Sequence, residues 1–327
     1  MIKYPDKLKK DDEIRVLAPS HSMSSVSKHH IELAKKKLEG LGFVVTFGKN
    51  VYEMNDFNKS SSVQARVDDL HEAFNDKNVK MILPVIGGYH SNQLLSHLDW
   101  ELIKSNSKIV GGYSDTTALQ NAISAKTGIV TYSSIAFIMM AKTRNNQYSF
   151  DSLMQCLTTN EEYEMAPCDK WDDSEWYIDQ ENYELFDTTE LNTIHSGKAK
   201  GRVIGGNLGT FRLLQGTQYF PCLKEDYIYF LEECTPSKGV DFARELQSLI
   251  HVSDLTNLKG IVIGRFQIDS QVDNVMLAKI IAEISEISNI PIISNAPFGH
   301  TYPIATFPIG GLVEIDANQK LIKIIEH

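Results

Sequence analysis

The chain has 327 residues, of which 42% are hydrophobic and 23% are charged, and its formal net charge is −10. These values are typical of a globular protein that is long enough for two domains. The negative charge argues against a nucleic-acid-binding protein, and no apolar run is long enough to span a membrane.

The first half of the chain alternates predicted strands with predicted helices. Apolar runs predict strands at residues 13–19, 43–47, 79–86 and 109–110, with a fifth at 128–132. Helical periodicity predicts helices at 27–41 and 60–75, a third through Leu94, Leu95 and Leu98, and a fourth from Thr116 to about Ser124. This alternation is typical of a parallel sheet covered on both faces, so we expect a doubly wound N-terminal domain over residues 1–160.

The stretch around Ser114 is the most informative part of this domain. A short strand passes through Gly111-Gly112 to Tyr113-Ser114-Asp115, and a helix then begins. A serine in such a turn is well placed to be a nucleophile, because its hydroxyl is lifted clear and the free N–H groups of the helix can stabilise an oxyanion. Thr116 stands where the hydrolase elbow G-x-S-x-G has its second glycine, and a simple helix cap is the alternative role for Ser114.

Three loops are expected at the carboxyl edge of this sheet, where parallel sheets carry their sites. They comprise residues 19–22, residues 87–90 and the Ser114 turn. We expect the backbone N–H groups of Gly88 and Asp115 to form an oxyanion hole there. Neither glycine pair belongs to a phosphate-binding motif.

An acidic segment follows, from Glu161 to Glu190. It holds twelve acidic residues against one base, Lys170, and it also carries Trp171 and Trp176. Its charge and lack of periodicity predict a solvated loop. Its aromatic residues favour either a lid with a stacking surface or rings that dock on a domain face.

The remaining residues, 191–327, predict a second domain of alternating strands and helices. Strands are expected at residues 227–234, 260–265 and 290–295, after an opening glycine-rich stretch at 201–209. Helices are expected from there to about Leu214, at 240–250 and at 275–288. A turn region at 302–311 precedes two closing strands at 312–315 and 321–324.

A nucleophilic serine needs a base, usually a histidine that a carboxylate orients. Among the ten histidines, His300 lies just after a predicted strand on a loop rich in glycine and proline, which would hold it in place. The alternatives in or near the loops of the active edge are His21, His90 and His97. Glu232 and Glu233 end an apolar strand, where a carboxylate needs a partner.

Several stretches carry a resemblance to a known family. They are Ile86-Gly-Gly-Tyr-His-Ser-Asn-Gln-Leu-Leu95, Gly111-Gly-Tyr-Ser-Asp-Thr-Thr-Ala-Leu119, Gly205-Gly-Asn-Leu208, Ile228-Tyr-Phe-Leu-Glu232, Phe298-Gly-His300 and Phe307-Pro-Ile-Gly310. Their sequence and order resemble the LD-carboxypeptidase family of serine peptidases, which includes the microcin C self-immunity peptidases.

The resemblance implies roles for three residues. Ser114 would be the nucleophile, Glu232 the orienting carboxylate and His300 the base. The family commonly has aspartate after that glutamate, whereas this chain has Glu233. The family also implies an α/β fold, with a flavodoxin-like N-terminal domain, a smaller C-terminal swivelling β/α domain and a homodimeric assembly.

The long acidic segment, taken as a linker over residues 161–190, resembles the microcin-immunity branch. There, an aromatic residue of this loop stacks on the nucleotide base of the substrate, and Trp171 and Trp176 are the candidates.

We therefore expect a cytoplasmic serine peptidase that hydrolyses a C-terminal amide of a microcin C-like peptidyl or aminoacyl nucleotide. The charged N-terminus, which lacks the apolar core of a signal peptide, and the scattered cysteines favour the cytoplasm. No metal-binding motif is present, and we expect no cofactor. The alternatives are a murein tetrapeptide carboxypeptidase that releases terminal D-Ala, an α/β-hydrolase esterase, and a non-enzymatic two-domain protein that binds a small ligand.

Overall fold

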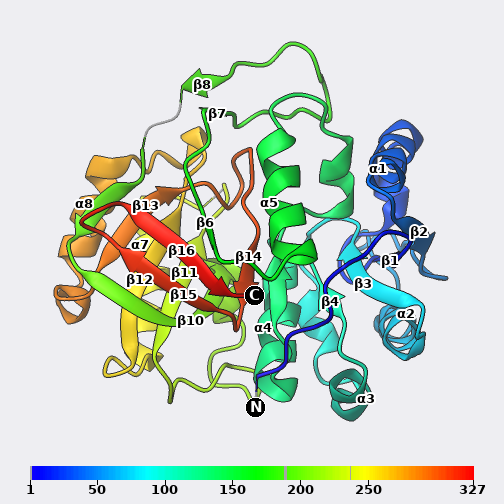
Figure 1. Ribbon diagram of the computed structural model, residues 1–327, viewed down its shortest axis with the longest axis horizontal. Helices are drawn as coiled ribbons and strands as arrows, with labels where there is room; N and C mark the ends of the chain where they lie inside the picture. The colour runs from blue at the N-terminus through cyan, green and yellow to red at the C-terminus, as the bar shows by residue number, and fades with distance from the viewer. Residues whose placement is uncertain (1, 188–189, 236) are drawn as a thin grey trace.

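A computed structural model describes residues 2–187, 190–235 and 237–327. Two domains lie side by side, with the N-terminal one on the right and the C-terminal one on the left of Figure 1. The predicted fold class is confirmed, because a parallel N-terminal sheet and a separate C-terminal sheet are both present. Residues 188 and 189, which fall within the predicted acidic segment, lie outside the described residues.

The N-terminal sheet has four parallel strands in the order β2-β1-β3-β4. This is the flavodoxin-like order. The strands are β1 (Glu13–Leu17), β2 (Val44–Phe47), β3 (Val79–Pro84) and β4 (Ile109–Val110). The helices of this half are α1 (Lys28–Gly40), α2 (Val63–Asn75), α3 (Trp100–Ser105), α4 (Thr116–Thr127) and α5 (Gln147–Thr158).

Two predictions for this domain are wrong in detail. The apolar residues Leu94, Leu95 and Leu98 do not share one helix, because a 3-10 turn spans Ser91–Leu94 and α3 begins separately after Asp99. The Asp99 carboxylate accepts hydrogen bonds from two N–H groups at the start of α3, which fixes where that helix begins. The expected fifth strand is β5 (Thr131–Ser133), and it pairs antiparallel with β14 (Phe307–Ile309) from the predicted turn region instead of joining the parallel sheet.

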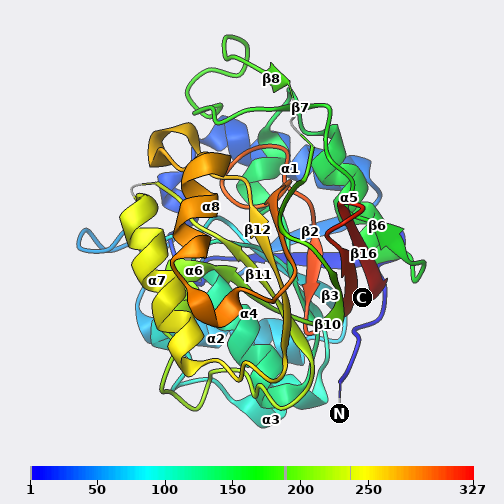
Figure 2. The same cartoon turned by 90° about the vertical axis from the view of Figure 1, so that its left-hand side faces the viewer.

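The C-terminal sheet has eight strands and is wider than its N-terminal counterpart. Its centre consists of four parallel strands: β10 (Lys198–Asn207), β11 (Tyr227–Glu232), β12 (Leu258–Gly264) and β13 (Ile292–Ala296). Antiparallel strands flank this centre: β9 (Asn192–His195) on one side, and β15 (Leu312–Asp316), β16 (Leu321–Glu326) and β6 (Tyr163–Glu164) on the other. The helices are α6 (Leu208–Arg212), α7 (Gly239–Val252) and α8 (Asn274–Ala282), and Figure 2 shows α7 and α8 along one side of the sheet.

The helix α4 joins the two domains. Nine of its residues are buried, and Asn121 exchanges two hydrogen bonds with the backbone of Gly205 on β10, at 2.8 and 3.2 Å. The hydroxyl of Thr117 also accepts a hydrogen bond from the N–H of Asn207, at 3.1 Å. One hydrophobic cluster includes side chains of both domains, among them Leu119 of α4 and Phe211 of α6. The position of α4 is therefore set by the C-terminal sheet as well as by its own domain.

The acidic segment is tied to both domains through Asp172. Its backbone exchanges two hydrogen bonds of 2.8 Å with Tyr302, two residues beyond His300. Its carboxylate lies 3.0 Å from the ammonium of Lys142, and neither side chain of this pair is exposed. Burial lowers the pKa of Lys142, and the charge of Asp172 opposes that shift. Two short strands, β7 (Lys170–Trp171) and β8 (Phe186–Asp187), form a hairpin whose connecting loop begins at Asp172, at the top of Figures 1 and 2.

Removal of the Asp172 carboxylate should destabilise the fold strongly, because it leaves the Lys142 ammonium buried without its counter-charge. We expect Asp172→Ala to lower the free energy of unfolding, measured by urea denaturation, by about 3–5 kcal/mol. Lys170→Met is the matched control, because Lys170 and Asp187 form an exposed ion pair, worth at most about 1 kcal/mol. Losses of equal size in the two variants would contradict a structural role for the buried pair.

Candidate active site

Ser114 lies at the sharp turn that the sequence predicts between β4 and α4. Its φ of +62° is in the left-handed region, which residues other than glycine seldom adopt. The turn is held by hydrogen bonds from Thr116 Oγ1 to the Tyr113 carbonyl and from the Thr117 N–H to the Ser114 carbonyl. A strained serine at the start of a helix is the backbone arrangement of nucleophile turns.

His300 and Glu232 of the C-terminal domain meet Ser114 in one hydrogen-bonded row. The imidazole Nε2 lies 3.1 Å from Ser114 Oγ, and its Nδ1 lies 2.7 Å from Glu232 Oε2. Glu232 is 3% exposed, and its Oε1 accepts no hydrogen bond from any described residue, so the carboxylate is directed at the imidazole. A carboxylate at Nδ1 keeps the proton there and leaves Nε2 as the acceptor for the serine hydroxyl.

The environment of His300 raises its pKa above the ordinary value of 6.5. Burial is the largest influence and lowers the pKa, but the charge and hydrogen bond of Glu232 more than offset it, with help from Glu233 and Asp173. The ring of Tyr113 packs against the imidazole at 5.1 Å between centroids. His300 is therefore held in place and made a stronger base than a free imidazole.

The neighbouring carboxylate, Glu233, has different partners. It accepts hydrogen bonds from the side-chain amide of Asn207 at 2.9 Å and from the N–H of Gly209 at 2.7 Å. These contacts hold the start of α6. Because successive strand residues point to opposite faces, the two adjacent glutamates are directed at separate partners.

The predicted oxyanion donors border Ser114. A methyl group on Gly87 would lie 3.1 Å from Ser114 Oγ, a tight contact that the loop avoids by having glycine there. The next residue, Gly88, has a φ of +146°. Among the hydrogen bonds of the described residues, the N–H groups of Gly88 and Asp115 have no acceptor. Both N–H groups are thus free to donate to another acceptor.

Two buried side chains, those of Arg66 and Asp115, hold the loops of this edge together. The sequence pattern did not predict this role for either of them. Arg66 donates 3.0 Å hydrogen bonds to the carbonyls of Pro19 and His90. The Asp115 carboxylate accepts from the N–H groups of His90 and Ser91, at 2.9 and 2.8 Å. An arginine in the first turn of an amphipathic helix and on its apolar face, such as Arg66 on α2, is the sequence signal that could have found this clamp.

The alternative histidines do not reach Ser114. His21 packs against the rings of Tyr89 and His90, at 5.9 and 6.0 Å between centroids. Burial lowers the pKa of His21, and the nearby His90 lowers it further. His97 is exposed. His300 is the histidine that forms a hydrogen bond with the serine.

The two predicted tryptophans have different surroundings. Trp176 is 1% exposed and packs against His30 and Tyr302, so no face of its indole is open to a ligand. Trp171 on β7 is partly exposed, with its ring 4.9 Å from that of Phe186 and 5.1 Å from the guanidinium of Arg265. Because of this burial, Trp176 is unsuited to the stacking role, and Trp171 is the remaining candidate.

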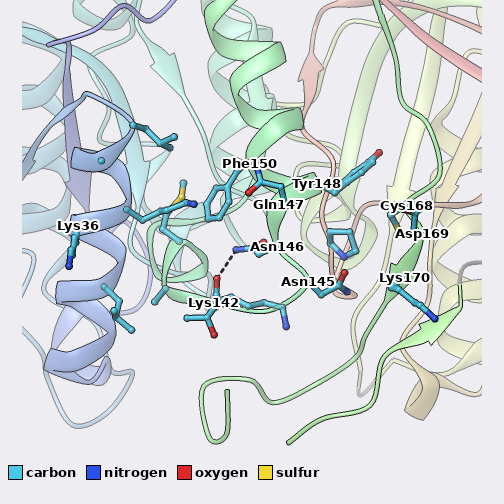
Figure 3. Close-up of a pocket in the computed structure, with 18 of the residues that line it drawn as sticks. Lys36, Lys142, Asn145, Asn146, Gln147, Tyr148, Phe150, Cys168, Asp169 and Lys170 are labelled. Carbon is cyan, nitrogen blue, oxygen red and sulfur yellow. Dashed lines mark hydrogen bonds between the residues drawn. The ribbon is translucent and has the colours of Figure 1, made fainter. Parts of the chain in front are cut away.

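A large cavity lies away from this row of residues. It has a volume of about 1140 Å³ and is enclosed by α1, α5 and the stretch that includes Cys168, Asp169 and Lys170 (Figure 3). Ser114, Glu232 and His300 are not among its lining residues.

In the described part of the chain, no group of three or more histidine, cysteine or acidic side chains is placed to hold a metal ion. Every described helix is too short or too polar to cross a membrane.

Comparison with known proteins relates both domains to one family. Residues 14–134 match the LD-carboxypeptidase N-terminal domain, and residues 200–315 match the LD-carboxypeptidase C-terminal domain. A Bacillus subtilis protein with a carboxypeptidase name, YocD, is 46% identical over 314 residues, which cover 96% of each chain. An MccF-like protein of Bacillus anthracis has a solved structure with a TM-score of 0.97 and 47% identity, covering 99% of this chain and all of its own.

The microcin C7 self-immunity protein MccF of Escherichia coli is more distant. It is 28% identical, with 97% of this chain and 94% of MccF covered. An MccF structure in complex with aspartyl sulfamoyl adenosine has a TM-score of 0.91 and covers 99% of this chain and 98% of its own. These similarities, over both domains and nearly the whole length, show that the chain belongs to the LD-carboxypeptidase family of peptidases and is a carboxypeptidase enzyme.

Proposed function

We propose that this carboxypeptidase is a serine peptidase in which Ser114, His300 and Glu232 act as a catalytic triad. The observation that carries the proposal is the row of hydrogen bonds, 3.1 and 2.7 Å long, that joins these residues across two domains. The strained turn at Ser114 supports it independently, and the raised pKa of His300 is the expected consequence of the contact with Glu232.

The reaction follows from the positions of these groups. Ser114 Oγ attacks the amide carbonyl while Nε2 of His300 takes its proton. The imidazolium then gives that proton to the departing amine, and an acyl-serine remains. A water molecule, deprotonated by the same imidazole, attacks the acyl group and releases the acid and the free serine. Glu232 keeps the proton on Nδ1 and stabilises the imidazolium by its charge.

The N–H groups of Gly88 and Asp115 are proposed to bind the oxyanion of the tetrahedral intermediate. Loss of one donor of this kind typically costs about 3–4 kcal/mol of transition-state stabilisation. The clamp formed by Arg66 and the Asp115 carboxylate fixes both loops, so the two donors keep their positions as charge develops. The chemistry needs no metal or cofactor.

We propose a microcin C-like aminoacyl or peptidyl nucleotide as the substrate, cleaved at its C-terminal amide. Structures of MccF hold aspartyl sulfamoyl adenosine and glutamyl sulfamoyl guanosine. The partly exposed ring of Trp171, carried on a short hairpin of the acidic segment, offers a base a stacking surface. Stacking of a base on an aromatic side chain contributes about 1–3 kcal/mol.

Family membership keeps one of the alternative functions and excludes two others. A murein tetrapeptide carboxypeptidase would use the same triad on an L,D-peptide bond, and it is the second candidate because the family is that of the LD-carboxypeptidases. Membership of a peptidase family excludes the purely ligand-binding alternative and the α/β-hydrolase esterase.

We also propose that the protein is a homodimer, that it is located in the cytoplasm, and that its domains span residues 1–160 and 191–327 on either side of the segment 161–190.

Substitutions in the triad test the catalytic proposal. Ser114→Ala and His300→Ala should each abolish nearly all turnover, and the double variant should be little worse, because triad residues act as a unit. Glu232→Ala should be strongly impaired, whereas Glu233→Ala should retain most of its kcat, since its partners lie at α6. These values come from steady-state hydrolysis of a defined amide by variants whose folding is checked by circular dichroism. A folded Glu233→Ala variant that is slower than Glu232→Ala would show that the carboxylate assignment is wrong.

A side-by-side assay of an aspartyl-adenylate amide and a murein tetrapeptide tests the substrate proposal. The wild type should cleave the adenylate amide with the higher kcat/KM. Trp171→Ala should raise KM for that substrate about 5- to 150-fold, as loss of base stacking predicts, and should change tetrapeptide cleavage little. Trp176→Phe is the control, because the Trp176 indole is buried. Cleavage of the tetrapeptide alone would establish the murein enzyme instead.

A further inference from the structure

Arg265 is a buried cation that has no carboxylate partner among the residues that the structure describes. It follows β12 directly and is 5% exposed. Its Nε donates to the side-chain oxygen of Asn295 at 3.0 Å, and its Nη1 contacts the Cys168 sulfur at 3.7 Å. Its buried Nη2 donates to no described residue. A buried charge without a counter-ion costs folding free energy, so such a residue calls for a functional reason.

The acidic segment surrounds this arginine without neutralising it. Among residues 2–187, 190–235 and 237–327, no carboxylate lies within ion-pair distance of its nitrogens. Acids of the segment have other partners: among them, Asp172 binds Lys142, Asp173 accepts from Gln267 and Ile268, Asp187 pairs with Lys170, and Glu190 pairs with Lys320. A segment with twelve acids and one base thus supplies no ion-pair partner for Arg265 from its described residues.

Arg265 also lines a cavity of about 720 Å³. The rings of Trp171 and Phe186 form one wall, and the amides of Gln267 and Asn274 lie among the polar lining groups. Two acids line it as well. The first, Asp187, is 89% exposed and paired with Lys170, and the second, Asp273, caps α8 through the N–H of Met276 at 2.7 Å. The cavity therefore combines aromatic faces, amides and one buried guanidinium.

This cavity lies at the catalytic edge of the C-terminal sheet. The strand β12 runs between β11, which ends at Glu232, and β13, which leads to His300. Gly264, the residue before Arg265, is packed so closely that a methyl group on it would lie 3.0 Å from Cβ of Glu232. Ser114, Glu232 and His300 do not line this cavity, so what links Arg265 to the proposed triad is the strand edge that they share.

We propose that Arg265 is the receptor for an anionic group of the substrate, either the phosphate of a nucleotide or the carboxylate of a terminal amino acid. The proposal rests on the proposed peptidase function and names the residue that would hold the charged end of its substrate. A guanidinium can donate two parallel N–H groups to two oxygens of either anion. Because Nη2 is buried, an anion reaches it only when the groups that cover it move aside.

Equilibrium binding tests this assignment without relying on turnover. The proteins are Ser114→Ala, the same chain with Arg265→Gln, and the same chain with Arg244→Gln, an exposed arginine of α7 that serves as the matched control. The probes in isothermal titration calorimetry are AMP, adenosine and N-acetyl-D-alanine. We expect Arg265→Gln to weaken the binding of AMP or of N-acetyl-D-alanine by about 10-fold or more and to leave adenosine unchanged. The probe that is affected identifies the anion.

Two results would overturn the proposal: a folded Arg265→Gln protein that binds both anions as tightly as the Arg244→Gln control, or a Ser114→Ala protein that binds neither anion. If Arg265→Gln does not fold, anion binding is measured with Arg265→Lys instead, because lysine keeps the charge but lacks the paired N–H groups of the guanidinium. We expect about 10-fold weaker anion binding, and unchanged binding would contradict the paired contact. Since the readout is equilibrium binding and not turnover, failure here leaves the triad proposal standing, and failure of the triad leaves the binding result intact.

Discussion

The docking of α4 on β10 is the constraint on which the site depends. Asn121 satisfies the backbone of Gly205 in both directions, so α4 cannot slide along β10 without breaking two buried hydrogen bonds. Ser114 lies at the start of α4, and β10 is paired in register with β11, which ends at Glu232. The helix therefore carries a residue of one domain to a fixed distance from residues of the other. A hydrogen bond of 3.1 Å from Ser114 to His300 depends on that register.

The acidic segment adds a second connection between the domains. Asp172 holds Lys142 of the N-terminal half by charge and holds Tyr302, in the loop after His300, by its backbone. Trp176 is buried against the same tyrosine. The segment thus contacts the loop that follows the proposed base, His300, and its hairpin of β7 and β8 places Trp171 over Arg265. The prediction that aromatic rings of this segment dock on a domain face holds for Trp176, whereas Trp171 lines a cavity.

Local patterns in the sequence predicted most of the elements, because each strand and helix of a covered sheet carries its own apolar period. The turn at Ser114 was predictable from its glycines, and His300 from its place after a strand. The rest depends on contacts between distant residues. The run through Leu94 and Leu98 looked helical, but Asp115 captures the N–H groups of His90 and Ser91, while α3 starts afresh at its own cap. The partner of β5 is β14, far along the chain. No local pattern reveals the buried pairing of Asp172, or that Arg265 Nη2 has no partner among the described residues.

The central claim is that Glu232 makes His300 an effective base for Ser114, and the pH dependence of kcat/KM tests it most directly. The base must be neutral, so kcat/KM should rise with pH through the pKa of His300, which lies above 6.5. In Glu232→Gln, burial still lowers that pKa while the opposing charge is lost, so the rise should move to lower pH, with a much smaller maximum. A rise that stays at the same pH in Glu232→Gln would contradict the account.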